Sequence, residues 1–479
     1  MQEPLHASYR SRLTILLTAF AVIASLLACG VLPTPRPTEP SPELPATALP
    51  TSTPMATATI TPTPITTATA LPISLSTASP VSEAGQTQPS ETANTPAVPE
   101  PAPPPAFKAL GDAIVSYLAE SGGNTAALVS ALEQWGMVPK QLVALAALAS
   151  QPSVLTADLD GDGQSEVIIA ATNPSPDVIF GEGTVLVVTQ KNGQYSVAYD
   201  SNAKGETPGP VAILAITDVN GDDISDLAFG MESCGAHTCM VDVHVLSYQN
   251  GAYVNLAEGV TVAYPDMIAI QDSSVQGLKD IVIHGNTIGS VGAGPQRAST
   301  LTYKLEGGHY KLAAVRYDPS NLLYFKVVDA GIALAEGRTD EAVQLYTQAI
   351  TDQSLIASGM MMNGMNEVQE DKTLRSFARF RLMVAQAKRG DQPAAQAAME
   401  QAVATGGPFA PVAQTFWNAY AQAKAIDPAC QAVAAYMQNA SDLLDILNSF
   451  GYANPSFDAT DVCQGMGMGV LLPEATPAA

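Results

Sequence analysis

The sequence predicts a multidomain chain with both α and β structure: a disordered N-terminal tether, a β-repeat domain that is partly propeller-like, and an α-helical repeat domain. Three observations lead to this order. A long Pro- and Thr-rich stretch follows the N-terminus, a unit of acidic loop, strands and tight turn occurs three times in the middle, and alanine-rich helical patterns fill the C-terminal part. The predicted segments are 1–29, 30–106, 107–153, 154–320, 321–465 and a flexible tail, 466–479.

The bulk composition favours folded domains and argues against nucleic acid as a partner. A chain of 479 residues, 47% of them hydrophobic, has room for two or three sizeable cores. Its 21 Lys and Arg residues against 45 Asp and Glu residues give a net charge of −24. Such a chain repels phosphate backbones, whereas cations complement its surface.

The first 29 residues predict export and lipidation. Arg10 and Arg12 precede an apolar run over 13–28, which is shorter than the roughly 20 residues that span a bilayer and suits the core of a signal peptide. The run ends in LLAC, which resembles the lipobox of bacterial lipoproteins. The resemblance implies that Cys29 becomes the N-terminus and carries a lipid that anchors the chain to a membrane, with the rest on the extracytoplasmic face of the cell envelope. An uncleaved membrane anchor is the alternative.

Residues 30–106 predict an extended tether. Most of this segment is Pro, Thr, Ala and Ser, with about half of the 36 prolines of the chain and hardly any charge. Such a composition leaves too little apolar area to compensate for the entropy of ordering. We therefore expect a disordered, partly polyproline segment that holds the folded part away from the membrane.

Residues 107–153 predict helices that serve packing rather than chemistry. Apolar residues recur there at helical spacing, and these are Leu110, Ile114, Tyr117, Leu118, Leu128, Leu132 and Trp135. The pair Gly122-Gly123 separates two helices, and the run LVALAALA over 142–149 predicts a third.

Residues 154–320 predict three similar β units. Acidic segments at 158–166, 218–226 and 272–280 each precede an apolar strand, and the tight turns that follow contain Asn192-Gly193, Asn250-Gly251 and Gly307-Gly308. Four short strands per unit are typical of propeller blades. Because a closed ring usually has four to eight blades, an open stack of sheets is the alternative.

The acidic loops predict bound cations, since carboxylates at alternate positions of a tight loop repel one another unless a cation lies between them. Hard oxygen ligands in this number suit Ca²⁺, whereas Mg²⁺ demands a stricter octahedron. An EF-hand is excluded, because its bidentate Glu would fall at Ile169. The loops resemble FG-GAP and VCBS-type repeats instead, in which an acidic residue closes the loop directly before a strand.

That resemblance covers Thr156 to about Asp318 and implies two calcium sites. The first would use Asp158, Asp160, Asp162, the carbonyl of Gln164, and Glu166. The second would use Asp218, Asn220, Asp222, the carbonyl of Ile224, and Asp226. The third loop has Ser274 and Gln276 at the inner positions, so we expect no calcium there. Asx turns without metal are the alternative for all three loops.

Four cysteines remain beside Cys29 and allow three disulfide connectivities. An extracytoplasmic location permits disulfides, and the local pairing joins Cys234 to Cys239 and Cys430 to Cys463. A metal site that combines the thiols with His237 or His244 is the alternative.

The helical part resembles tetratricopeptide repeats. One copy has Gly337 at the helix turn and Ala342 and Tyr346 in the second helix, and another has Gly390 and Ala395 at the same offsets. The proline expected at the end of each repeat is missing. A methionine-rich insertion between the copies predicts packing, with copper binding as the alternative.

The chain lacks the short motifs of common enzymes, including G-x-S-x-G, H-E-x-x-H and the P-loop. The sequence therefore favours a calcium-binding, non-enzymatic surface adaptor for protein or glycan, because both repeat families mostly bind other macromolecules. An extracellular hydrolase, or the accessory subunit of a polymer-degrading enzyme, is the alternative.

We expect Cys29→Ser to leave an unprocessed precursor, because the lipid-accepting thiol is lost. Electrophoresis and membrane fractionation of the wild type and the variant measure the effect. A variant that migrates and fractionates like the wild type would show that Cys29 carries no lipid.

Overall fold

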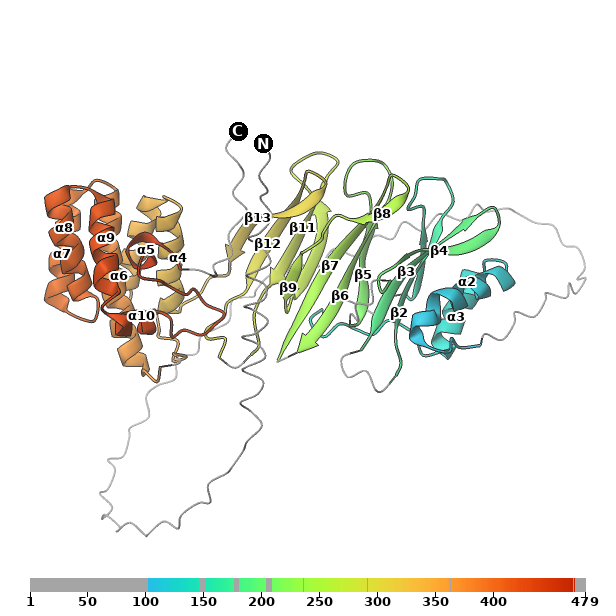
Figure 1. Cartoon of the computed structure of the whole chain (residues 1–479), viewed down its shortest axis with the longest axis horizontal. Coiled ribbons are helices and arrows are strands. Elements are labelled where there is room, and N and C mark those ends of the chain that lie inside the picture. The colour runs from blue at the N-terminus through green and yellow to red at the C-terminus, as the bar shows by residue number, and fades with distance from the viewer. Residues whose placement is uncertain are drawn as a thin grey trace, which may run out of the picture. The chain divides into compact units, whose positions relative to one another are not determined.

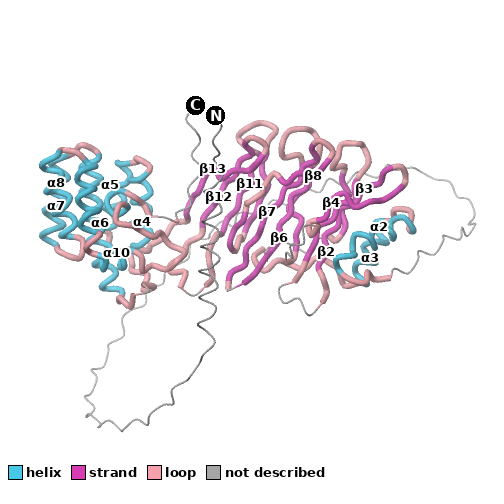
Figure 2. Tube along the Cα trace, viewed as in Figure 1, coloured by secondary structure: helices cyan, strands magenta, loops and turns pink. Residues whose placement is uncertain are grey.

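The computed structural model describes residues 102–145, 152–175, 181–203, 209–235, 237–290, 292–361, 363–467 and 469. Cys29, nearly all of the predicted tether and most of the predicted tail therefore lie outside the described residues. Antiparallel sheets and helices are both present, as predicted, with helices before and after the strands in the sequence (Figures 1 and 2). None of the helices in these ranges is both long and apolar enough to cross a membrane.

Two helices, α2 (Leu110–Glu120) and α3 (Thr125–Gln134), follow a short 3₁₀ turn, η1 (Phe107–Ala109). Gly122 and Gly123 separate them with φ angles of 65° and 82°, which only glycine adopts without strain. The side chain of Asn124 then accepts the amide of Ala127 and caps α3. The apolar positions predicted for these helices are buried.

The predicted third helix does not form over residues 142–145, which adopt a bend and a turn. The amides of Val143 and Ala144 donate to the carboxylate of Glu232, at 3.1 and 2.7 Å. These amides would also lack an intrahelical partner in the first turn of a helix, so the buried carboxylate of Glu232 satisfies donors that no local bond reaches. Residues 146–149 lie outside the described ranges.

Among the described residues, three antiparallel sheets follow one another along the chain. The first contains β1 (Val154–Ala157), β2 (Glu166–Thr172), β3 (Gly183–Lys191) and β4 (Gln194–Asp200). The second contains β5 (Val211–Thr217), β6 (Asp226–Gly235), β7 (Thr238–Gln249) and β8 (Ala252–Asn255), with β9 (Thr261–Ala263) paired to β7. The third contains β10 (Met267–Asp272), β11 (Lys279–Gly285), β12 (Ser299–Glu306) and β13 (His309–Tyr317).

The sheets pack face to face in a stack (Figure 1). One face of the first sheet, which includes Ile169, packs against α2 and α3. Its other face, with Ile168, packs against Phe229 of the second sheet, and Val243 of the second sheet packs against Ile283 of the third. Strands buried on both faces are continuous apolar runs rather than alternating ones, which explains the composition of β2. No closed ring of sheets is found in the described part of the chain.

The C-terminal helices pack mainly as successive antiparallel pairs. They are α4 (Leu323–Ala335), α5 (Thr339–Thr351), α6 (Glu367–Lys388), α7 (Gln392–Thr405), α8 (Ala410–Ala423), α9 (Ile426–Met437), α10 (Ser441–Leu447) and α11 (Asp461–Gln464). Gly337 and Gly390 follow the ends of α4 and α6 with φ angles of 76° and 83°, the left-handed conformation that commonly ends a helix. Met361, from the methionine-rich segment, is buried in the helical core, as packing predicts.

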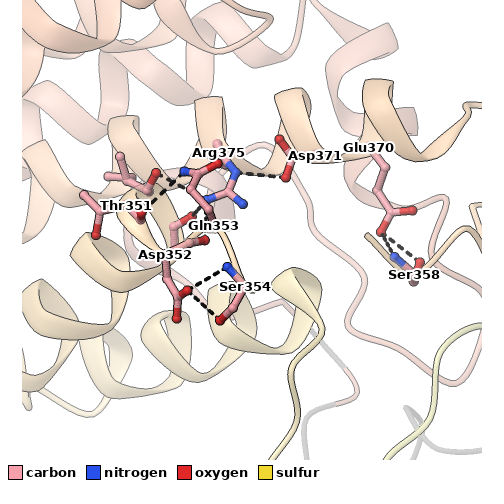
Figure 3. Close-up of polar contacts among 10 residues, drawn as sticks. Thr351, Asp352, Gln353, Ser354, Ser358, Glu370, Asp371 and Arg375 are labelled. Carbon is pink, nitrogen blue, oxygen red and sulfur yellow. Dashed lines mark hydrogen bonds and ion pairs between the residues drawn. The ribbon is translucent and has the colours of Figure 1, made fainter. Parts of the chain in front are cut away.

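Two side chains of α6 hold the connection between α5 and α6 (Figure 3). Arg375 donates to the carbonyl oxygens of Ala349 and Asp352, at 2.8 and 3.1 Å. Glu370 accepts the amide and the hydroxyl of Ser358, at 2.7 and 2.8 Å. Arg375 thereby satisfies carbonyl groups at the end of α5 that no helical amide reaches.

Both predicted disulfides are present, and each closes a different part of the fold. Cys234 and Cys239 are paired in register on β6 and β7. Cys430 of α9 is joined to Cys463 of α11. The second bond fixes the end of the helical region to its core, as the sequence predicts.

His284 of β11 contacts carboxylates on both sides of the third sheet. Its Nδ1 lies 2.6 Å from Asp266, just before β10, and its Nε2 lies 3.1 Å from Asp318, just after β13. A neutral imidazole donates from only one nitrogen, so two carboxylates favour the protonated ring. The hydrogen bond with Asp266 is the largest cause that raises the pKa of His284.

We expect His284→Gln to remove a pH-dependent part of the free energy of unfolding, no more than about 1 kcal/mol because the pair is partly exposed. The folded-state pKa lies above the ordinary value of about 6.5. The stabilisation is therefore complete below about pH 6.5 and is lost as the pH rises through the folded-state pKa. Urea denaturation between about pH 5 and about pH 9 measures it, with His309→Gln as the control. Parallel wild-type and His284→Gln profiles across this range would contradict the prediction.

Candidate metal sites in the acidic hairpin loops

The three acidic loops occupy equivalent hairpins. In each loop the acidic residue that closes it pairs with the last residue before the loop, and these pairs are Ala157–Glu166, Thr217–Asp226 and Gln271–Asp280. The strand register thus confirms the alignment of 158–166, 218–226 and 272–280 within the chain. The closing carboxylates are 1%, 2% and 7% exposed, because they enter the stack with the strands that they begin.

The first loop is built around Asp158, whose two oxygens accept the amides of Gly161 and Gly163 at 2.8 and 3.0 Å. Asp162 accepts the amide of Gln164 at 2.8 Å in an Asx turn. These bonds fix the loop backbone and leave further carboxylate lone pairs for a ligand. Asx turns and a bound cation are therefore compatible in this loop.

Three of the predicted ligands in the first loop come together. Oxygens of Asp158, Asp160 and Glu166 lie within 4.8 Å of one another. One oxygen of Glu166 accepts the amide of Leu159 at 2.7 Å, and burial raises the pKa of Glu166. The ammonium of Lys191 lies 3.2 Å from Asp160 and neutralises part of this charge.

The second loop repeats this construction. Asp218 accepts the amides of Gly221 and Asp223 at 2.8 and 3.0 Å, as Asp158 does in the first loop. Asp222 accepts the amide of Ile224 at 2.9 Å. The two loops therefore have the same backbone hydrogen bonds as well as the same register.

One carboxylate oxygen of Asp226, in the second loop, lacks a hydrogen-bond partner among the described residues. Its Oδ2 accepts the amide of Val219 at 2.8 Å, but its buried Oδ1 has no hydrogen-bond partner among the described residues. Burial raises the pKa of Asp226 to about 6, and the nearby hydroxyl of Ser247 opposes this with a smaller effect. An unpartnered buried carboxylate oxygen is costly. A cation held with Asp218 and Asn220 would remove that cost.

Neighbouring acidic loops touch at the same edge of the stack. A Cβ added to Gly161 would lie 2.9 Å from the side chain of Ile224, and one added to Gly221 would lie 3.1 Å from the carbonyl oxygen of Gly277. Both glycines also have positive φ, at 72° and 79°. Gly161 and Gly221 are thus required for two reasons: the loop backbone has a positive φ there, and the neighbouring loop leaves little space for a side chain.

The third loop has a lysine paired with its first carboxylate, as the first loop has Lys191 paired with Asp160. Asp272 is exposed and pairs with Lys279 at 2.8 Å. Lys304 donates to the hydroxyl of Ser274 at 3.4 Å. Asp280 is buried with one oxygen unpartnered, so this loop retains the closing carboxylate and has basic side chains of the chain itself nearby.

Sequence reasoning missed the residue opposite each closing carboxylate. The strand register places Thr189, Ser247 and Lys304 at equivalent positions of the third strand of each sheet. Thr189 donates to the second oxygen of Glu166 at 3.4 Å. The two loops with full ligand sets therefore have a hydroxyl at this position, and the third has an ammonium. Aligning the tight turns in the sequence would have identified the position.

A tyrosine in the fourth strand of each sheet was also missed. Tyr195, Tyr253 and Tyr310 occupy equivalent register positions and follow each turn as Gly-x-Tyr, which is the sequence signal. Tyr310 donates to the carbonyl oxygen of Lys279 at 3.0 Å. Burial raises the pKa of Tyr253, with a further contribution from Glu166 in the preceding sheet. Tyr253 thus lies close to the preceding sheet, whereas the side chain of Tyr310 bonds within its own sheet.

The alternative metal site at the cysteines does not have the required ligands. Glu232 lies close to Cys234 and Cys239, but the two sulfurs form a disulfide and are not thiolates. The carboxylate of Glu232 already accepts two backbone amides. The ring of His244 stacks on Phe229, 4.8 Å between centroids. The acidic loops therefore remain the candidate metal sites.

Comparison with known proteins gives no match to a family model, a curated protein or a solved structure. The internal repeat supplies a comparison within the chain instead. The three loops share one strand register. The first two have oxygen-bearing side chains of the predicted types at the ligand positions, whereas the third does not.

We expect the combination Ser274→Asp, Gln276→Asp and Lys304→Ser to create one further calcium site, because it restores the residue types of the first two loops. Calorimetric titration of the purified full chain should show one more bound ion than the wild type. Lys372→Ser, which removes a lysine from α6, is the control. An unchanged stoichiometry in a folded triple variant would mean that Lys304 does not decide whether this loop binds metal.

Proposed function

We propose that this chain is a calcium-binding, non-enzymatic adaptor of the cell envelope, anchored through lipid on Cys29. The observation that carries the calcium assignment is the grouping of carboxylate oxygens of Asp158, Asp160 and Glu166 within 4.8 Å of one another, in a loop whose main backbone hydrogen bonds the second loop repeats. Carboxylate, amide and carbonyl oxygens are the ligands that Ca²⁺ prefers. The residues of the first two loops therefore fit the ion that the FG-GAP and VCBS resemblance implies.

Calcium in this place would be structural. The loops lie where successive sheets touch, so an ion that neutralises Glu166 or Asp226 would stabilise the packing of layers. Extracellular calcium modules commonly have dissociation constants of about 10⁻⁴ to 10⁻³ M. Ambient calcium would keep such sites loaded, so no sensing role is needed.

The similarity between two helical pairs supports the adaptor role. The pairs α4–α5 and α6–α7 share the turn glycine and the buried alanines Ala342 and Ala395. This agrees with tetratricopeptide-like units, which mostly bind protein segments. The proposed partner is accordingly a protein or a glycan at the cell surface.

The alternative is a hydrolase, and the feature that bears on it is His284 between Asp266 and Asp318. A histidine with two carboxylates is capable of proton transfer. However, His284 does not line the cavities of about 290, 510 and 410 Å³ in the described part of the chain, although Asp318 lines the second of them. The geometry therefore favours the adaptor.

We expect the purified full chain to bind about two calcium ions, and Asp160→Ala with Asp162→Ala to reduce this to one, because the first loop loses two carboxylates. At calcium concentrations about 100 times the dissociation constant, each site should add about 2.7 kcal/mol to the free energy of unfolding. Calorimetry and thermal unfolding with calcium or a chelator measure both effects. Glu120→Ala with Glu133→Ala removes two exposed helical carboxylates as the control.

Absence of binding at millimolar calcium, or identical binding by the loop variant and the wild type, would leave the loops as Asx turns without metal. The adaptor role is tested with the same samples, by capture of components from envelope extract with and without calcium. Turnover of an extracellular polymer by the purified chain would instead favour the hydrolase.

A further inference from the structure

The last residue of the third strand in each sheet differs in charge between the three repeats. These residues directly precede the tight turns, and they are Lys191, Gln249 and Glu306. Side chains two positions apart on a strand point to the same face. Lys191 therefore extends on the same side as Thr189, which donates to the closing carboxylate Glu166.

In the first sheet this residue is a cation in contact with the acidic loop. The Nζ of Lys191 lies 3.2 Å from Oδ2 of Asp160, while Oδ1 of Asp160 accepts the amide of Asp162 at 3.2 Å. The side chain of Asp160 is 5% exposed, whereas that of Lys191 is 54% exposed. The ammonium thus lies at the oxygen of Asp160 that the loop backbone does not use.

In the second sheet the same two positions hold neutral side chains. Asn220 stands at the position of Asp160, and Gln249 stands at the position of Lys191. The amide groups of Asn220 and Gln249 both donate to the hydroxyl of Ser247, at 3.0 and 3.4 Å. A carboxylate with an ammonium in the first loop therefore corresponds to two amides in the second.

This exchange gives the two predicted sites the same charge. The first site has four carboxylates at its ligand positions, and the ammonium of Lys191 reduces their summed charge from −4 to −3. The second site has three carboxylates and Asn220, with a summed charge of −3. Asp223 is exposed and stands outside the ligand positions of the second loop.

An ammonium beside a ligand opposes the binding of a divalent cation. Like charges a few Å apart near a protein surface repel one another appreciably. A calcium ion held by Asp160 would either lie close to the Nζ of Lys191 or displace the lysine side chain from its ion pair. Both outcomes cost free energy, and the neutral Gln249 imposes no such cost on the second loop.

We infer that Lys191 sets the calcium affinity of the first loop, because its ammonium competes with the ion for Asp160. Without calcium, the ammonium neutralises part of the charge of that loop. The inference deepens the proposed calcium function and rests on it. It assigns a role to a residue outside the predicted ligand set.

The first site can be titrated alone after Asn220→Ala with Asp222→Ala has disabled the second. In this background we expect Lys191→Gln to tighten calcium binding about threefold or more, because the competing charge is removed. Calorimetry of the full chain measures the affinity. Lys191→Arg keeps the charge and should bind like the background, as should Lys372→Gln, which removes an exposed charge from α6.

Two further variants test the assignment to the pair of Asp160 and Lys191. Adding Asp160→Asn to Lys191→Gln recreates the residues of the second loop and should cancel most of the gain. In the otherwise unchanged chain, Gln249→Lys should weaken the second site.

Thermal unfolding separates competition from a structural role of Lys191. We expect Lys191→Gln to lower the thermal midpoint in chelator and to enlarge the rise that calcium produces, because the loop carboxylates lose a neutralising charge. A structural role alone would lower the midpoint equally with and without calcium and would leave the affinity unchanged.

The inference is overturned, and the calcium proposal stands, if the background binds calcium and Lys191→Gln does not tighten it, or if Lys372→Gln tightens it equally. If neither loop of the unaltered chain binds calcium, the calcium proposal fails and the inference fails with it. Circular dichroism checks that Lys191→Gln is folded. Should it not fold, unchanged affinity of the second site in Gln249→Lys overturns the inference.

Discussion

The burial of a carboxylate at the start of the second strand of each sheet is the constraint on which the β domain depends. Glu166, Asp226 and Asp280 enter the stack, where they are 1%, 2% and 7% exposed. A buried charge must be paired or neutralised. The loop backbone donates one amide to Glu166 and one to Asp226. The second oxygen of each carboxylate then needs another donor or a cation from the rest of the loop.

The three loops surround their closing carboxylates with different side chains, although they share one strand register. The first two surround the carboxylate with further oxygens and a hydroxyl, which together suit a cation from solution. The third leaves one oxygen of Asp280 without a hydrogen-bond partner in the described part of the chain, while Lys279 pairs with Asp272 and Lys304 bonds to Ser274. On one register, the position opposite the closing carboxylate thus holds Thr, Ser or Lys.

Buried arginine side chains hold connections between elements in the helical region. Arg375 and Arg381 donate to backbone carbonyl groups rather than mainly to carboxylates, and they fix the end of α5 and the segment around α11 to α6. Arg297 joins the end of the third sheet to α4 through two aromatic rings and Asp329. Few basic residues occur in this chain, and several of them hold connections between elements.

The sequence by itself determined the order of elements, the three hairpin units with their turns, and both disulfide pairings, because turn glycines, apolar runs and cysteine spacing are local signals. It also placed Asp158 and Asp218 in equivalent loops. Only the tertiary structure brought Glu232, 88 or more residues away in sequence, to the amides of Val143 and Ala144. It likewise brought Lys304 to the third loop, because strand register joins residues that no local pattern connects.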